Sequence, residues 1–239
     1  MSENSQKVVI VTGGSQGIGA GIVAGYRDRG WAVVSNALKI KPSDDPSVLT
    51  VEGDVSKPET ADRIISEALS RFGRVDTLVN NAGVFVGKPF TDYTAEDYAL
   101  VTGVNLAGFL WLTQRAIAEM LKAGGGHVVN MSAAIALYAD ARAPSGLAAL
   151  TKGGLAAVTK SLGVEYATRG IRVNAIAPGV IQTPMHPPES YKGDKGERLP
   201  PMGHVGQVSD IVRGILYLED SPYVTGQVLS IDGGRTAGY

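Results

Sequence analysis

Short runs of apolar, often β-branched residues alternate along the chain with longer segments in which apolar residues recur at helical spacing. The short runs predict strands at residues 7–12, 31–35, 48–52, 76–80, 127–132, 171–177 and 227–231. The longer segments predict helices at about 17–29, 58–72, 95–122, 147–168 and 208–218. Because strands and helices alternate, we expect right-handed crossovers and a parallel sheet covered by helices on both faces.

The predicted elements follow one another without a linker, repeat or low-complexity tract, so we expect a single domain over residues 1–239. The segment 183–203 is the exception, because it has no hydrophobic period and is rich in proline, glycine and charge. Loops of this length in compact domains often cover a binding site. We therefore predict a flexible substrate flap at 183–203.

Composition narrows the classes of function. The net charge of −1 gives no general attraction to nucleic acid or to an anionic membrane. The absence of cysteine excludes disulfides, thiolate nucleophiles and cysteine-ligated metals. The first residues, MSENSQK, are polar, and no stretch approaches the roughly 20 apolar residues of a membrane span. We expect a cytoplasmic protein whose ligand is a small molecule.

A glycine-rich turn joins the first predicted strand to the first predicted helix and reads TGGSQGIG over residues 12–19. Glycine permits a tight turn and a close approach of the backbone to a pyrophosphate, whose charge is stabilised by the N-terminus of the following helix. The turn predicts a dinucleotide site in an α/β, Rossmann-type doubly wound parallel sheet of about seven strands.

Six motifs in chain order resemble those of the short-chain dehydrogenase/reductase family over residues 7–235. They are TGGSQGIG, Asp54-Val55, the NNAG at 80–83, Asn105, the segment 178–185 with PG and TPM, and the IDGG at 231–234. The resemblance implies a nicotinamide cofactor and a homodimer or homotetramer that pairs through the long helices. The implied cofactor contacts are Gly13, Ser15, Gln16, Ile18, Gly19, Asn36, Lys39, Asp54, Val55, Asn81, Ala82, Gly83, Lys152, Pro178, Gly179, Ile181, Thr183 and Met185.

The end of the second predicted strand bears on the choice between NAD and NADP. An acidic residue there hydrogen-bonds the ribose hydroxyls of NAD, whereas basic residues accommodate the extra phosphate of NADP. This chain has Ala37 where NAD enzymes of the family usually carry aspartate, and Lys39 and Lys41 follow. We therefore favour NADP(H), although Gln16 stands where NADP users of the family often have arginine.

The catalytic residues depart from the family pattern. Family members pair a proton-donating tyrosine with a lysine four residues later, on one face of a helix. Lys152 matches the lysine, and Asn105 matches the family's structural and catalytic asparagine, but the tyrosine position is Ala148. The sequence thus predicts a complete cofactor site in an active site that lacks the proton-donating tyrosine.

The substrate-stabilising serine is also altered. Ser132 is followed by Ala133, where the second and catalytic serine of the family often stands. Ser132 lies sixteen positions before Ala148, about three more than is usual, which predicts a remodelled loop. Ser132 either contacts the substrate or only ends its strand.

The inserted loop supplies candidates for a replacement acid, which must come within hydrogen-bond reach of the reacting oxygen. Tyr138 is the best of them chemically, beside Asp140 and Arg142, although simple packing of its ring is the commoner role. His186 and His204 are read as solvated loop residues and His127 as structural. None of the histidines has the spacing of a metal site.

Two classes of function fit this pattern. The first is an NADP(H)-dependent reductase with a non-standard active site that transfers hydride to a small C=N, activated C=C or C=O substrate. The alternative is a non-catalytic NADP-binding sensor or partner subunit. An engineered change at Ala148 is a third explanation, which the altered neighbours Gly146 and Leu147 make less attractive.

Overall fold

The computed structural model describes residues 6–141, 143–185 and 199–238, and it contains a seven-stranded sheet in the order β3-β2-β1-β4-β5-β6-β7. Every neighbouring pair of strands is parallel, as the sequence predicted. The strands are β1 (Val8–Thr12), β2 (Ala32–Ala37), β3 (Val48–Glu52), β4 (Thr77–Asn80), β5 (Gly126–Met131), β6 (Ile171–Pro178) and β7 (Val228–Ile231). The strand order reverses beside β1, where ligands bind in open α/β sheets.

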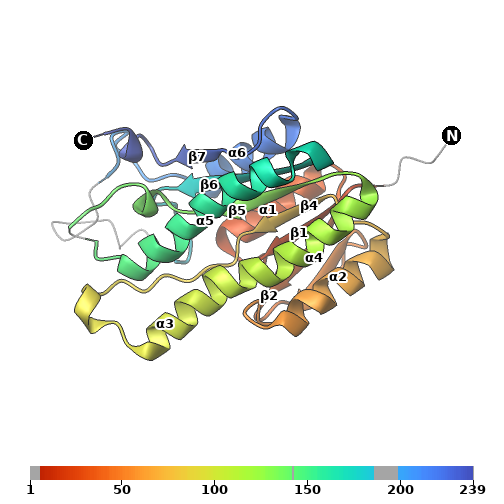
Figure 1. Ribbon diagram of the computed structural model, residues 1–239, viewed down its shortest axis with the longest axis horizontal. Coiled ribbons are helices and arrows are strands. Elements are labelled where there is room, and N and C mark those ends of the chain that lie inside the picture. Colours follow the sequence, from red (N-terminus) through yellow and green to blue (C-terminus); the bar gives the residue numbers. More distant parts are fainter. Residues whose placement is uncertain (1–5, 142, 186–198, 239) are drawn as a thin grey trace.

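Helices cover both faces of the sheet (Figure 1). They are α1 (Gly17–Asp28), α2 (Pro58–Phe72), α3 (Ala95–Thr102), α4 (Gly108–Ala123), α5 (Gly146–Glu165) and α6 (Val208–Asp220). One apolar core lies under α2 and α4 and includes Ile64 and Leu112, whereas the other lies under α1 and α6 and includes Ile22 and Ile215. The central strands β1, β2 and β4 are buried on both sides, as expected inside a parallel sheet, whereas the edge strands β3 and β7 are only partly buried.

The predicted helix at 95–122 is not one regular α-helix. It begins at Thr94, whose hydroxyl accepts a hydrogen bond from the Asp97 amide at 3.2 Å, while the Asp97 carboxylate accepts one from the Thr94 amide at 3.0 Å. A π-helical segment, Gly103–Ala107, then interrupts it between α3 and α4. Such segments often occur at functional sites. This one contains the buried Asn105 and so sets the position of that side chain.

A buried polar cluster at the amino end of the sheet joins helices α1 and α6 to strands β4, β5 and β6. One carboxylate oxygen of Glu219, on α6, accepts hydrogen bonds from the hydroxyls of Tyr26 at 2.8 Å and Thr77 at 3.0 Å. Nδ1 of His127 lies 3.0 Å from the same oxygen, and Arg172 binds the carbonyl of Glu219. Burial lowers the pKa of His127, which favours the neutral form of its ring. The structural role predicted for His127 is consistent with this cluster.

The predicted flap is described only at its two ends, because 186–198, with His186, lies outside the described residues. Gln182 donates its amide to Gly206 at 2.9 Å, which ties the start of the segment to the residues before α6. His204 is exposed, and its Nδ1 lies 3.0 Å from the carbonyl of Val205. Within the ranges given above, no helix is long and apolar enough to cross a membrane, and no group of acidic and histidine residues could hold a metal.

Candidate active site

The glycine-rich turn between β1 and α1 has the geometry of a phosphate cradle. Gly13 and Gly17 have φ angles of +67° and +54°, which side chains rarely adopt. A Cβ on Gly19 would lie 2.0 Å from the carbonyl oxygen of Gly13, so the turn closes only around glycine there. The N-cap residue Gln16 makes no side-chain cap hydrogen bond within the described residues. The first amides of α1 can therefore bind an anionic group.

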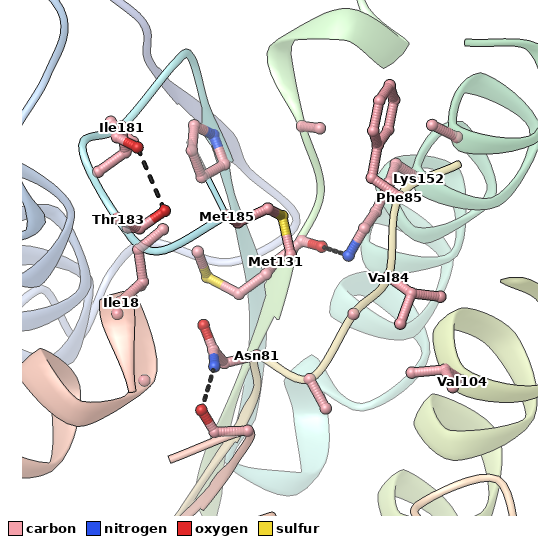
Figure 2. Close-up of a pocket in the computed structure, with 18 of the residues that line it drawn as sticks. Ile18, Asn81, Val84, Phe85, Val104, Met131, Lys152, Ile181, Thr183 and Met185 are labelled. Carbon is pink, nitrogen blue, oxygen red and sulfur yellow. Dashed lines mark hydrogen bonds between the residues drawn. The ribbon is translucent and has the colours of Figure 1, made fainter. Parts of the chain in front are cut away.

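Asn81, at the end of β4, holds this turn in place. Its side-chain amide donates to the carbonyls of Thr12 at 2.9 Å and Gly13 at 3.2 Å. In return, the hydroxyl of Thr12 accepts the backbone amides of Asn81 and Ala82. The NNAG motif thus joins the β4 end to the phosphate cradle, and the dashed line at Asn81 in Figure 2 marks its bond to the Gly13 carbonyl.

The end of β2 closes one wall of the cofactor region. The Asn36 side chain is fully buried and donates to the carbonyls of Val51 at 2.9 Å and Gly53 at 3.2 Å. Its Oδ1 has no hydrogen-bond partner in the described part of the chain. Ala37 and Leu38 line the pocket, whereas Lys39 is exposed and lies outside the lining. Asn36 therefore braces β2 against β3.

A single cavity of about 550 Å³ extends from the phosphate cradle to α5. Figure 2 shows Ile18, Ile181 and Thr183 on one side of it and Phe85 and Lys152 on the other. All the residues predicted to contact the cofactor line this cavity except Lys39. Of the predicted catalytic residues, Lys152, Ser132 and Tyr138 line it, and Asn105 lies behind its wall.

Lys152 projects from α5 toward the end of β5, where its Nζ donates to the carbonyl of Met131 at 2.7 Å (Figure 2). Loss of hydration lowers the pKa of Lys152 to about 8. A Cβ on Gly83 would lie 2.9 Å from this Nζ, so the glycine of NNAG leaves room for the ammonium group. The charged amine is therefore held at the cavity wall, between β4 and β5.

Asn105 supports the same region from the π-helical segment. Its Oδ1 accepts the amide of Val84 at 2.9 Å, and its Nδ2 donates to the carbonyl of Val84 and the hydroxyl of Thr151. These bonds fix the segment after NNAG against α5, next to Lys152. Asn105 is thus placed as a positioning residue, with its polar atoms turned to the protein.

The hydroxyl of Ser132 is also turned to the protein, because it donates to the carbonyl of Lys152 at 2.9 Å. Ser132 is buried, and this bond ties the end of β5 to α5. Ala133 and Ala148 line the cavity beside it. The two alanines, at the positions that the family resemblance gives to serine and tyrosine, thus present only methyl groups to a ligand.

A second polar group lies in the cavity wall, formed by Tyr138, Asp140 and Arg235. The guanidinium carbon of Arg235 lies 5.5 Å from the centre of the Tyr138 ring. Tyr138 and Asp140 were predicted from the sequence, whereas Arg235 was missed although it stands directly after the IDGG motif. Arg142, named with them, lies outside the described residues.

Comparison with known proteins identifies the family. A family model described as enoyl-(acyl carrier protein) reductase matches residues 13–236. A 3beta-hydroxysteroid dehydrogenase 1 from Eggerthella lenta is 36% identical, over 96% of this chain and 94% of that protein. A solved structure described as ElxO with NADP bound has a TM-score of 0.90 at 30% identity, covering 98% and 100% of the two chains.

A 3-ketoacyl-(acyl-carrier-protein) reductase from Brucella melitensis, complexed with NADH, has a TM-score of 0.85 at 28% identity, covering 96% of this chain and 98% of that one. The chain belongs to the short-chain dehydrogenase/reductase family. It is an oxidoreductase of that type.

The residues present fit a nicotinamide dinucleotide, because the glycine cradle, with its positive φ angles, and the start of α1 line one cavity that extends to Lys152. When bound, such a cofactor supplies or accepts a hydride. The α1 amides would hold its pyrophosphate, and the Lys152 ammonium would hold a ribose hydroxyl. The chain itself must then orient the substrate and manage its proton.

Proposed function

We propose that this chain is an NADP(H)-dependent reductase with a non-standard active site, acting on a small C=N, activated C=C or C=O substrate. The supporting observation is the pairing of an intact cofactor cradle with Ala133 and Ala148 at the cavity wall next to Lys152. An oxygen that gains charge during reduction needs a donor to stabilise it. Methyl groups supply none, so substrates that develop little oxygen charge suit this wall best.

Imines meet that requirement, and activated alkenes come closer to it than ketones do. An iminium carbon is already electron-poor and accepts hydride with no oxygen charge. Hydride addition to the β-carbon of an activated alkene gives a delocalised anion that is less basic than an alkoxide and can be protonated afterwards by solvent. A ketone would depend on a substitute donor, for which Tyr138 is the candidate in the cavity wall. We therefore expect cyclic imines and activated enones to be better substrates than ketones.

A panel of cyclic imines, activated enones and ketones tests this proposal by following NADPH consumption, with NADH run in parallel. We expect turnover of imines or enones that exceeds turnover of ketones. Tyr138→Phe should leave imine reduction unchanged and remove any ketone reduction. If no substrate of the panel causes NADPH consumption, although fluorescence confirms that NADPH binds, the result would favour the non-catalytic alternative.

We further propose that the cofactor is NADP(H), because Ala37 places no carboxylate at the β2 end of the cavity and Lys39 lies exposed just beyond it. Ala37→Asp is expected to weaken NADPH binding by about tenfold, or ~1.4 kcal/mol, through repulsion of the 2′-phosphate. NADH binding should stay level or improve. Fluorescence titration of both cofactors measures the change.

Ala37→Asn is the matched control, since it has the size of the aspartate without its charge. It should preserve the NADPH preference. Equal losses in the two variants would show a steric effect and would contradict the proposed role of charge.

We also propose a homodimer or homotetramer. The α3–α5 layer supports it, since Tyr98, Leu110 and Leu150 are exposed there by 55%, 41% and 58%. Burial of such apolar side chains against a second copy would stabilise an assembly. Light scattering of the purified protein measures its mass directly.

A further inference from the structure

We propose that Lys152 donates the proton to the nitrogen of a neutral imine, so that the substrate class is a protonatable imine and not a permanently charged iminium ion. The inference deepens the proposed function and rests on it for the hydride. It starts from the cavity wall formed by α5, from which Lys152 projects toward the end of β5 (Figure 2).

Ala148 opens the cavity toward Lys152. The two residues are four positions apart on α5, so their side chains lie on the same face of the helix. Both line the cavity, and Ala148 contributes only a methyl group to it. A larger side chain at position 148 would fill part of the space beside the lysine. With alanine there, a substrate can approach the ammonium group directly.

The Lys152 ammonium has more donors than its contact with the protein uses. An ammonium carries three N–H groups, and the Met131 carbonyl accepts one of them at 2.7 Å. A second N–H would hold a ribose hydroxyl of the cofactor, and the third would serve the substrate nitrogen. Gly83 provides the space that these ligands need, because a Cβ at this position would lie 2.9 Å from Nζ.

Two other predicted catalytic side chains are directed away from a substrate. The Ser132 hydroxyl donates to the carbonyl of Lys152. The Asn105 amide group bonds to the backbone of Val84 and the hydroxyl of Thr151. Lys152 is therefore better placed than Ser132 or Asn105 to supply a proton.

Burial makes Lys152 a stronger acid than an ordinary lysine. Loss of hydration lowers its pKa to about 8. The other ionisable residues in the described lining of the cavity are Asp54, Tyr138, Asp140 and Arg235, and none of these four contributes to the shift. A general acid works best when its pKa is near the operating pH, so this ammonium is suited to donate near neutrality.

The charge of Lys152 also decides which form of the substrate can bind. A charged Lys152 repels an iminium cation, and this repulsion is strong where water is excluded. The amine and the bound substrate therefore share one proton, as closely interacting titratable groups do. A neutral imine binds beside the ammonium, whereas a quaternary iminium ion binds only when Lys152 is neutral.

The proton and the hydride balance in this step. The imine carbon gains a hydride from the nicotinamide, and the electron pair of the C=N π bond forms the new N–H bond with the Lys152 proton. The products are an amine, the oxidised cofactor and a neutral Lys152. Solvent then returns a proton to Lys152.

Steady-state kinetics at saturating NADPH tests the proposal on two substrates of similar shape, 3,4-dihydroisoquinoline and N-methyl-3,4-dihydroisoquinolinium. Lys152→Gln should lower kcat/KM for the neutral imine by about 10²–10⁴-fold, the usual contribution of a general acid. At pH 7 it should raise kcat/KM for the iminium ion by about tenfold, because about one tenth of an amine with a pKa of about 8 is neutral there. In the wild-type protein, kcat/KM for the iminium ion should rise as the pH passes through about 8.

Two further variants separate the proton from the other roles of Lys152. Lys152→Arg keeps a cation and N–H donors for the cofactor, but a guanidinium does not release its proton. It should lose turnover of the neutral imine and gain none on the iminium ion. Lys160→Gln, which replaces an exposed lysine about two turns further along α5, is the matched control and should behave as wild type.

A second readout needs neither substrate nor cofactor. Acetic anhydride reacts with the neutral form of an amine, so mass spectrometry of the Lys152 peptide as a function of pH reports ionisation in the intact protein. We expect half-maximal labelling near pH 8. A midpoint at about pH 10, the value of an ordinary lysine, would overturn the proposal, because the donor role depends on an amine that is partly neutral near pH 7.

The outcomes separate the donor role from the proposed function. If Lys152→Gln lowers turnover of both substrates equally, Lys152 only holds the cofactor and the donor role is overturned. If Tyr138→Phe removes reduction of the neutral imine, that phenol supplies the proton and the donor role is overturned as well. A wild-type protein that reduces enones but neither of these two substrates keeps the reductase and overturns the donor role. A protein that reduces nothing on the panel contradicts both.

Discussion

Ala148→Tyr is expected to raise the rate of ketone reduction by about 10²–10⁴-fold, the usual contribution of a positioned general acid. Ala148 is buried, lines the cavity and lies one helical turn before Lys152 on α5. A phenol at this position would share a helix face with the Lys152 ammonium, which would lower the pKa of the phenol. Steady-state kinetics on the ketone panel measures the gain.

Ala148→Phe separates the proton donor from the bulk of the ring, since it differs by one hydroxyl. It should show no gain on ketones, and neither variant should speed the reduction of cyclic imines. The affinity for NADPH should change little in either protein. If the tyrosine variant reduces ketones no faster than the phenylalanine variant, the wild-type site already holds another acid, and Tyr138 becomes the first residue to replace.

The sheet was predictable because its signals are local. Each strand is a short β-branched run bounded by turn residues, and burial on both faces leaves such a run few alternatives. The predicted boundaries therefore lie within one or two residues of β1 to β7. The phosphate cradle was predictable for the same reason, because the spacing of Gly13, Gly17 and Gly19 determines the conformation of the turn.

Side-chain directions were not predictable, because they depend on contacts between distant segments. The sequence left Ser132 between two roles, and its hydroxyl is directed to the carbonyl of Lys152. The π-helical segment at Asn105 interrupts what the hydrophobic period suggested as one continuous helix. Arg235 was missed because it lies more than ninety residues from Tyr138, the ring that it contacts.

The cluster at Glu219 was even harder to predict, because its members come from α1, α6, β4, β5 and β6. Glu219→Ala is expected to lower the free energy of unfolding by roughly 3 kcal/mol. The change leaves the Tyr26 and Thr77 hydroxyls and the His127 ring without their shared acceptor, and an unsatisfied buried donor costs about 1–3 kcal/mol. For a chain of this length, the melting temperature should fall by about 6–12 °C.

Asp220→Ala is the matched control, since Asp220 is the next residue on α6 and forms a surface ion pair with Arg29. Exposed pairs contribute about 0–1 kcal/mol, so its melting temperature should stay near that of wild type. Equal losses in the two variants would show that the end of α6, rather than the shared acceptor, carries the effect. Calorimetry at pH 7 with the cofactor absent measures both.

The same cluster contributes to the pH dependence of stability. Burial opposes ionisation of Glu219, but hydrogen bonds from His127, Tyr26 and Thr77 outweigh it and lower the pKa of the carboxyl. A lowered pKa means that the unfolded chain binds the proton more readily, so the contribution of Glu219 is full above the unfolded glutamate pKa of about 4.3. It is lost as the pH falls through the folded value. Because Glu219 also raises the pKa of His127, the gap in stability between wild type and Glu219→Ala should be at least as large at pH 5 as at pH 7. It should narrow below about pH 4.3 as Glu219 takes up its proton, whereas a purely steric effect of the alanine would persist into acid.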